Sequence, residues 1–234
     1  MAYDRLSPIL AGKRACMFDL FHTLTSIEDT TPDARMSWEI LGVPRDLWIE
    51  QLMVKSPERL KGSDIDPFAT IARMARAIRP DIPDTLIRQA TENRKRIFRR
   101  SLLYMPKDSL RTLSSLKRLG MKIGLVSNAD TLERAGWEEC PAAPFFDSVV
   151  FSCDVGFMKP EPGIYEISLR ALDEHPERCV FSGDGGSEEL RGAREAGITT
   201  VLVHGMIGRL WPELIPARRI HADHVVERVS DLLV

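Results

Sequence analysis

The sequence has no long apolar run, no paired cysteines and no excess of charge of one sign. No apolar run reaches the roughly 20 residues that a membrane-spanning helix needs. The formal net charge is -2, so there is no basic surplus for nucleic acid or an anionic membrane. The four cysteines form no CxxC pair, which argues against a disulfide framework or a zinc site and favours buried, reduced thiols: Cys16, Cys140, Cys153 and Cys179.

Residues 1–13 lack the continuous apolar stretch of a signal peptide. Together with the reduced thiols, this leads us to expect a cytoplasmic protein, monomeric or homodimeric, that meets small molecules. The 234 residues, 44% of them hydrophobic, can form one α/β domain or a core domain with a smaller insertion.

Short apolar runs rich in β-branched residues alternate with helical patterns along most of the chain. This alternation is typical of a parallel sheet covered by helices. The predicted strands are residues 15–18, 121–126, 148–152, 179–182, 199–203 and a short edge strand at 224–226. Helices predicted at 107–119, 162–172 and 188–196 have the right length for the crossover connections.

Residues 25–105 break the alternation, because they contain helical patterns alone. The predicted helices cover residues 34–41, 46–52, 67–78 and 85–103. We interpret this segment as an all-helical cap domain inserted between the first and second strands. Residues 1–24 and 106–234 would then form a Rossmann-like α/β core.

The last cap helix carries a basic run, Arg94-Lys95-Arg96 followed by Arg99 and Arg100. Such a run could bind an anion. Its amphipathic pattern favours a solvated helix face instead, with Ile97, Leu102 and Leu103 turned inward.

Polar residues stand where four of the predicted strands end. They are Asp19, Ser127-Asn128, Lys159-Pro160 and Asp184, in that order along the chain. In an open parallel sheet, ligands bind beyond the carboxyl ends of the strands. We therefore expect these side chains to converge on one site.

The segments that contain these residues resemble the four motifs of the haloacid dehalogenase superfamily. They read Phe18-Asp19-Leu20-Phe21-His22-Thr23-Leu24, Val126-Ser127-Asn128, Gly156-Phe157-Met158-Lys159-Pro160 and Gly183-Asp184-Gly185-Gly186-Ser187-Glu188-Glu189. The resemblance covers the whole predicted core, and the cap falls where the family's helical cap inserts. It implies hydrolysis of a small anionic metabolite through a covalent aspartyl intermediate, with Asp19 as the nucleophile.

The residue types suit these roles. A carboxylate becomes an effective nucleophile when it is oriented and when nearby charge is neutralised, and Lys159 is a compact cation for that purpose. Ser127 and the backbone N–H of Asn128 could bind an anionic oxygen at the start of the next helix, or could simply cap that helix. Thr23 is expected either to cap the first loop or to donate to Asp19.

Asp19 and Asp184, with one backbone carbonyl, would make an oxygen site suited to Mg²⁺. The resemblance implies that the carbonyl belongs to Phe21. Glu188 or Glu189 is expected to hold a metal-bound water or Lys159, although acidic residues are also ordinary near a helix N-terminus.

Phe21 departs from the family pattern, since phosphatase members usually have a second aspartate at that position. This aspartate protonates the leaving group, a contribution of about 10²–10⁴-fold. Halides and acyl phosphates leave without such a proton, and the resemblance implies that dehalogenase members carry an aromatic residue here. Those members also use a cap arginine, for which Arg35, Arg45 and Arg59 are candidates. Asp184, however, is typical of the Mg²⁺-using branch.

His22 stands where the family usually has glycine. Its pKa near neutrality would suit proton transfer in place of the missing aspartate. Alternation in an extended segment places Phe21 and His22 on opposite sides, so we expect His22 to fill space beneath the cap. We assign no role to the other histidines: His175, His204, His221 and His224.

Three hypotheses follow. The first is an Mg²⁺-assisted hydrolase that acts on a phosphorylated or acyl-phosphate-like metabolite. The second, based on Phe21, is a metal-independent 2-haloacid dehalogenase. The third is a binding protein that kept the fold and lost efficient chemistry.

Overall fold

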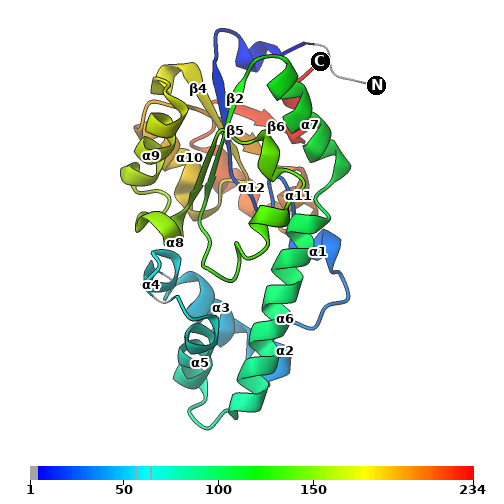
Figure 1. Cartoon of the computed structure of the whole chain (residues 1–234), viewed down its shortest axis with the longest axis vertical. Coiled ribbons are helices and arrows are strands. Elements are labelled where there is room, and N and C mark those ends of the chain that lie inside the picture. Colours follow the sequence, from blue (N-terminus) through cyan, green and yellow to red (C-terminus); the bar gives the residue numbers. More distant parts are fainter. Residues whose placement is uncertain (1–4, 56, 64) are drawn as a thin grey trace.

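A six-stranded parallel sheet forms the centre of the molecule (Figure 1). The computed structural model describes residues 5–55, 57–63 and 65–234; the predicted core and cap also include residues 1–4, 56 and 64, which lie outside this range. The strand order is β3-β2-β1-β4-β5-β6. The strands are β1 (Ala15–Phe18), β2 (Lys122–Ser127), β3 (Ser148–Phe151), β4 (Cys179–Gly183), β5 (Thr199–Val203) and β6 (His224–Val226).

Strand β1 lies between β2 and β4, and its four side chains are all buried. Cys16 and Phe18 join one apolar cluster, and Ala15 and Met17 join a second. The two clusters lie on opposite faces because successive strand side chains alternate. A continuous apolar run is therefore what a central strand covered on both faces requires.

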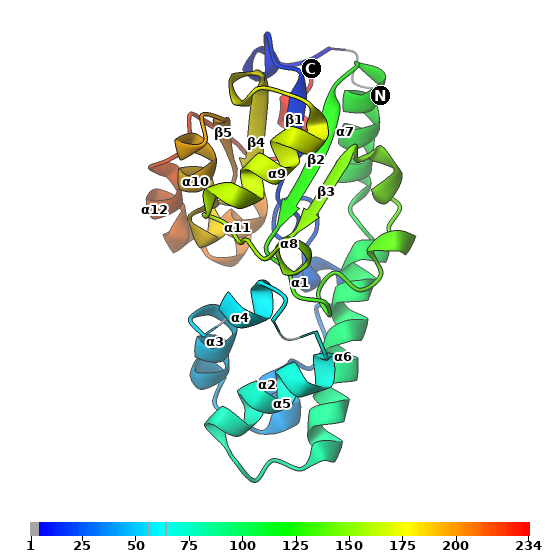
Figure 2. The same cartoon turned by 60° about the vertical axis from the view of Figure 1, so that its left-hand side comes forward.

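Helices cover both faces of the sheet (Figure 2). Helix α7 (Lys107–Arg118) packs on one face through Leu113 and Leu116. Helices α9 (Pro162–Leu172) and α10 (Glu189–Glu195) pack on the other face. Three shorter core helices are α8 (Ser152–Val155), α11 (Gly205–Leu210) and α12 (Ile215–Arg219).

A helical cap is inserted between β1 and β2 and lies beyond the carboxyl ends of the strands (Figures 1 and 2). Its helices are α1 (Ile27–Thr30), α2 (Ser37–Leu41), α3 (Arg45–Met53), α4 (Pro57–Leu60), α5 (Pro67–Ile78) and α6 (Asp84–Leu103). The cap has an apolar core of its own around Trp48, Ile71 and Ile87. The predicted architecture, an α/β core with a helical insertion, is thus confirmed.

Most predicted elements agree with the observed ones to within one or two residues. Helix α2 is an exception, because it begins at Ser37 and not at residue 34. The carboxylate of Glu39 accepts from the backbone N–H of Met36 at 2.5 Å, which places the helix start directly after Met36.

The basic run on α6 is solvated only in part. Lys95, Arg96, Arg99 and Arg100 are exposed, whereas the Arg94 side chain is 11% exposed and pairs with Glu133 of the core. The prediction that this run is wholly a solvated face was therefore wrong at Arg94. The reason is tertiary, since the loop after β2 brings a carboxylate against the helix.

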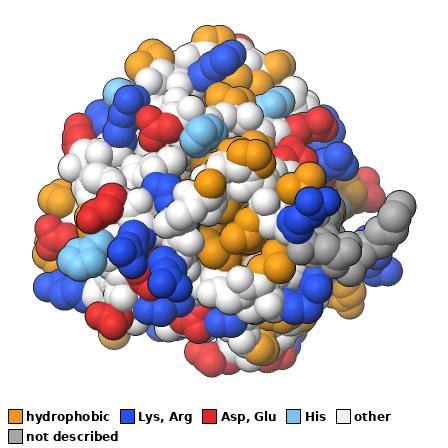
Figure 3. Space-filling model, turned by 90° about the horizontal axis from the view of Figure 1, so that it is seen from above, with side chains coloured by type: hydrophobic (Ala, Val, Ile, Leu, Met, Phe, Trp, Pro, Cys, Tyr) orange, Lys and Arg blue, Asp and Glu red, His pale blue; other side chains and the backbone are white. Residues whose placement is uncertain are grey.

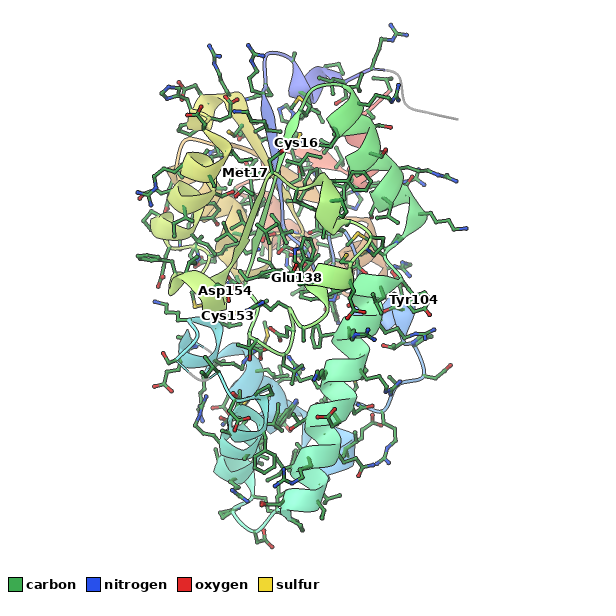
Figure 4. The ribbon with its side chains drawn as sticks, in the orientation of Figure 1. Cys16, Met17, Tyr104, Glu138, Cys153 and Asp154 are labelled. Carbon is green, nitrogen blue, oxygen red and sulfur yellow. The ribbon has the colours of Figure 1, made fainter. Side chains whose placement is uncertain are left out.

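The cap and the core approach each other closely at Gly62. Its φ is +75°, and a Cβ at this position would lie 2.0 Å from the carbonyl oxygen of Cys153. Figure 4 shows Cys153 and Asp154 at the end of the core that faces the cap. Glycine is therefore required here both by the backbone conformation and by the contact.

Among the described residues, no helix is long and apolar enough to cross a bilayer. Seen from the core end, acidic and basic side chains are interspersed, with apolar side chains between them (Figure 3). The four cysteines carry free thiols, as predicted, and Cys153 is the one that is not fully buried.

Candidate active site

Asp19 follows β1 directly, and its side chain has two fixed partners. Lys159 Nζ lies 2.5 Å from Asp19 Oδ1, and the Thr23 hydroxyl donates to Oδ2 at 3.0 Å. All three residues are buried. The first and third motifs therefore meet, as predicted. Of the two roles expected for Thr23, the structure shows the hydrogen bond to Asp19.

Lys159 also donates to Glu189 Oε2, again at 2.5 Å. Burial lowers the pKa of this lysine, but the charges of Asp19 and Glu189 and the hydrogen bonds to them outweigh burial and raise it. The ammonium therefore stays protonated and holds the Asp19 carboxylate in one orientation.

Asn128 holds the segment that carries Lys159. Its Oδ1 accepts from the Lys159 backbone N–H at 2.8 Å, and its Nδ2 donates to the Lys159 carbonyl at 3.1 Å. The Asn128 side chain thus positions the lysine. The helix expected directly after Ser127 and Asn128 is absent, because residues 128–130 are irregular and 131–136 form turns before the short 3₁₀ helix Trp137–Glu139. Anion binding by Ser127 and the Asn128 N–H stays a prediction.

Ser127 ends β2 with a buried hydroxyl that has no hydrogen-bond partner in the described part of the chain. A buried polar group without a partner is costly, so such a group at a strand end suits a ligand that arrives later. Asn128 lines the cavity described below, whereas Ser127 is not among the residues that line it.

The two adjacent glutamates of the fourth motif have different positions. Glu189 is 1% exposed, and its Oε1 accepts from the backbone N–H of Gly185 at 2.8 Å. Glu188 is exposed and pairs with Arg191 outside the site. The structure therefore brings Glu189 to Lys159 and leaves Glu188 outside.

Burial, followed by the charges of Asp19 and Asp184, raises the pKa of Glu189 to about 8, against the lowering effect of Lys159. Oxygen atoms of Asp19, Asp184 and Glu189 all lie within 4.8 Å of one another. These three buried carboxyl groups offer several oxygen atoms at the end of the sheet. This oxygen-rich set fits a hard divalent cation such as Mg²⁺.

Arg218 lies at this cluster and was not predicted from the sequence. Its Nη1 donates to Asp184 Oδ2 at 2.5 Å and to the Asp184 carbonyl at 3.0 Å. The arginine reaches the site from α12 by packing against Gly185, where a Cβ would lie 2.8 Å from Arg218 Cβ. No motif around residue 218 indicated this contact.

The expectation for His22 was wrong in its geometry. His22 has φ +63°, so the segment is not extended, and both Phe21 and His22 line the same cavity as Asp19. His22 Nε2 lies 3.0 Å from Glu28 Oε2. Burial lowers the pKa of His22, but the hydrogen bond to Glu28 and the charges of Glu28, Asp184 and Asp19 outweigh burial and raise it.

A cavity of about 580 Å³ extends from Asp19 into the cap. Its polar end contains Asp19, Asn128, Lys159, Asp184, Glu189 and Arg218. Phe21 lies beside this end, where its ring meets the ring of Phe98 edge-on with 5.0 Å between centroids. The cap therefore closes over Asp19. Phe21, at the position where the resemblance implies a second aspartate in phosphatase members, packs against Phe98.

The three cap arginines named above lie in different places. Arg35 is not among the residues that line the cavity, whereas Arg45 and Arg59 are. Arg59 is buried and donates to Asp130 Oδ2 at 2.6 Å, with Glu133 Oε1 3.0 Å away. Arg59 therefore joins the cap to the core. Arg45 is exposed, and its guanidinium lies 5.6 Å from the centre of the Trp38 ring.

Comparisons with known proteins agree with this geometry. Residues 13–197 match the family model described as haloacid dehalogenase-like hydrolase. The chain is 37% identical over 126 residues to a glyceraldehyde 3-phosphate phosphatase of Methanothermobacter thermautotrophicus, which covers 53% of this chain and 50% of the relative. The chain thus spans about half the length of that curated relative.

Two solved structures share the fold. A 2-haloacid dehalogenase from Pseudomonas syringae pv. Tomato has a TM-score of 0.62 at 22% identity, covering 94% of this chain and 96% of its own. The putative HAD-hydrolase YfnB from Bacillus subtilis, bound to magnesium, has a TM-score of 0.66 at 16% identity, with the same coverage. At such identities the likeness shows the fold alone, but the family model covers most of the chain and includes all four motif segments. The chain belongs to the haloacid dehalogenase-like hydrolases.

Proposed function

We propose that this protein is an Mg²⁺-assisted hydrolase that transfers the phosphoryl group of a small acyl-phosphate-like metabolite to Asp19 and then to water. The observation that carries the proposal is the buried cluster of Asp19, Lys159, Asp184 and Glu189. A binding protein would have no need of four buried ionisable groups at the end of a sheet, because burying such groups is costly.

In this proposal, the Asp19 carboxylate attacks the phosphorus atom. Thr23 and Lys159 hold Asp19 by both oxygens, which fixes the attacking atom, and Lys159 neutralises charge on the bound anion. Ser127 donates its free hydroxyl to an anionic oxygen of the substrate. Asp19, Asp184 and the Phe21 carbonyl would hold Mg²⁺, which supplies charge neutralisation at the phosphoryl group.

Phe21 limits the leaving group. A phenylalanine transfers no proton, so an alkoxide would leave poorly, whereas a carboxylate leaves from an acyl phosphate unprotonated. The curated relatives include a phosphatase of a phosphorylated metabolite, which supports phosphoryl chemistry. Phe21 restricts that chemistry to substrates whose leaving group is already stable as an anion.

A metal-independent 2-haloacid dehalogenase is the second candidate, and Arg218 favours it. Its guanidinium already supplies a positive charge to Asp184, the residue that would otherwise face a metal. Attack of Asp19 on the halogen-bearing carbon would release halide, which needs no proton from residue 21. Water would then cleave the Asp19 ester.

One pair of assays separates the candidates. The purified protein is given acetyl phosphate or 2-chloropropionate, each with Mg²⁺ and with EDTA. Phosphate release that requires Mg²⁺ supports the proposal, and halide release that is unaffected by EDTA supports the dehalogenase. No turnover of either substrate would contradict both.

A further inference from the structure

The acidic cluster around Asp19 lies at one end of the cavity. The body of the cavity, between the core and the cap, is lined by aromatic and aliphatic side chains from both domains. The aromatic ones are Phe21, Trp38, Trp48, Phe98 and Trp211, and the aliphatic ones include Ile27, Ile49, Leu52, Met53 and Ile97. Such a surface offers a ligand dispersion contacts and few hydrogen bonds.

The charged side chains in the body of the cavity already have partners. Arg59 and Arg94 pair with Glu133, and Glu28 pairs with His22. Each guanidinium keeps one buried Nε–H without a partner in the described part of the chain, whereas the wall around these groups is mainly apolar. Burying a substrate hydroxyl against the apolar wall, without a hydrogen bond, would be unfavourable.

Arg45 is the cap cation in the cavity that has no acidic partner among the residues described. It is exposed and lies over the Trp38 ring, where the guanidinium supports the orientation of the indole. Ser37 is a further polar residue of the wall. A few polar groups set in a mainly apolar wall do not match the ring of hydroxyls on a sugar phosphate.

The cavity above Asp19 is also larger than a two- or three-carbon acid requires. About 580 Å³ lies within the range of cavities that hold drug-sized ligands. A small substrate would leave the wall formed by Trp38, Leu52 and Trp211 in contact with water. Aromatic surface gains most when a flat apolar group covers it.

We infer that the natural substrate is an aromatic, largely apolar molecule that carries one anionic group. The aromatic part lies against Trp38 and Phe98, and the anionic group contacts Asp19 and Lys159. This inference rests on the proposed function for the anionic end. The cap then selects substrates by apolar contact, and sugar phosphates are disfavoured.

Equilibrium binding by calorimetry tests the inference without turnover. The probes are methylphosphonate, propylphosphonate, 2-hydroxyethylphosphonate and benzylphosphonate, each in the presence of Mg²⁺. Each buried methylene should tighten binding about fourfold (~0.8 kcal/mol). Benzylphosphonate should therefore bind at least roughly tenfold more tightly than methylphosphonate. Propylphosphonate should bind more tightly than its hydroxyl-bearing analogue.

A substitution in the cap tests whether Trp38 causes the preference for benzylphosphonate. Trp38→Ala should reduce the ratio between benzylphosphonate and methylphosphonate affinities severalfold and leave methylphosphonate binding unchanged. Trp38→Leu, which keeps apolar volume in the cap core, should lose less of that ratio. Tyr104→Ala is the matched control, since Tyr104 is 62% exposed and points away from the body of the molecule (Figure 4).

Two results would overturn the inference. One is benzylphosphonate that binds no more tightly than methylphosphonate, or that does not bind. The other is 2-hydroxyethylphosphonate that binds as tightly as propylphosphonate. Acetyl phosphate hydrolysis, measured separately, tests the proposed function, so its failure is distinguishable from a failure of the inference.

Discussion

The guanidinium of Arg218 lies 2.5 Å from the carboxylate of Asp184, at the edge of the acidic cluster beside Asp19. A cation that is part of the chain therefore stands next to the place where Mg²⁺ would bind. Both cations would bind the carboxylate of Asp184. Arg218 is expected to weaken Mg²⁺ binding, and this competition is the structural link between the two branches of chemistry considered above.

Removing this guanidinium should strengthen metal binding. We expect Arg218→Ala to lower the Mg²⁺ dissociation constant roughly tenfold (~1.4 kcal/mol), because one nearby positive charge is lost. Calorimetric titration with Mg²⁺, in the absence of substrate, measures this dissociation constant. Arg219→Ala is the matched control, since Arg219 is its exposed neighbour on α12. Equal affinities in the two variants would show that Arg218 does not compete with the metal.

Restoring an acid at position 21 should widen the range of leaving groups. Phe21→Asp is expected to raise kcat/KM for alkyl phosphates about 10²-fold relative to acetyl phosphate, because the aspartate can protonate an alkoxide. The comparison of the two substrates by phosphate release gives the ratio. Phe21→Leu removes the contact with Phe98 but adds no acid, and a similar gain in that variant would refute the explanation.

The free hydroxyl of Ser127 should bind the substrate anion. Ser127→Ala is expected to weaken inorganic phosphate binding about tenfold, the effect of one hydrogen bond to a charged group. The free energy of unfolding should change little, since no protein partner is lost. Ser7→Ala deletes another buried hydroxyl without a described partner, near Leu232 and away from the site. Unchanged phosphate affinity in Ser127→Ala would remove this role.

Arg59 should contribute strongly to stability as the buried charge that joins cap and core. Arg59→Ala leaves Asp130 and Glu133 buried with less compensation, and we expect the free energy of unfolding to fall by about 3–5 kcal/mol. Urea denaturation measures the loss. Arg45→Ala, an exposed arginine of the same cavity, should change stability by roughly 0.5 kcal/mol or less. Similar losses in both variants would contradict the assignment.

Much of this arrangement could be predicted from the sequence because strands and their ends are encoded locally. Ala15–Phe18 is an apolar run that a central strand requires, and the polar residue after it must lie at the sheet edge. Parallel strands bring such ends together whatever the loops between them do. This is why Asp19, Lys159 and Asp184 could be placed in one site before their distances were known.

The remaining features depend on contacts that no local pattern encodes. Arg218 reaches Asp184 across 34 residues of chain, and nothing near residue 218 resembles a motif. The turn at His22 needs φ +63°, a conformation that glycine would have signalled and histidine does not. Glu188 and Glu189 are neighbours of the same type, and only the turn geometry decides which of them faces Lys159.

The central claim is that Asp19 is the nucleophile, and the steady-state rate of Asp19→Asn measures it most directly. Asparagine keeps the size of the side chain but lacks the attacking carboxylate. On the substrate that the wild type hydrolyses, acetyl phosphate or 2-chloropropionate, the account predicts a loss in kcat on the order of 10³-fold or more with the fold intact by circular dichroism. Full turnover by Asp19→Asn would contradict it.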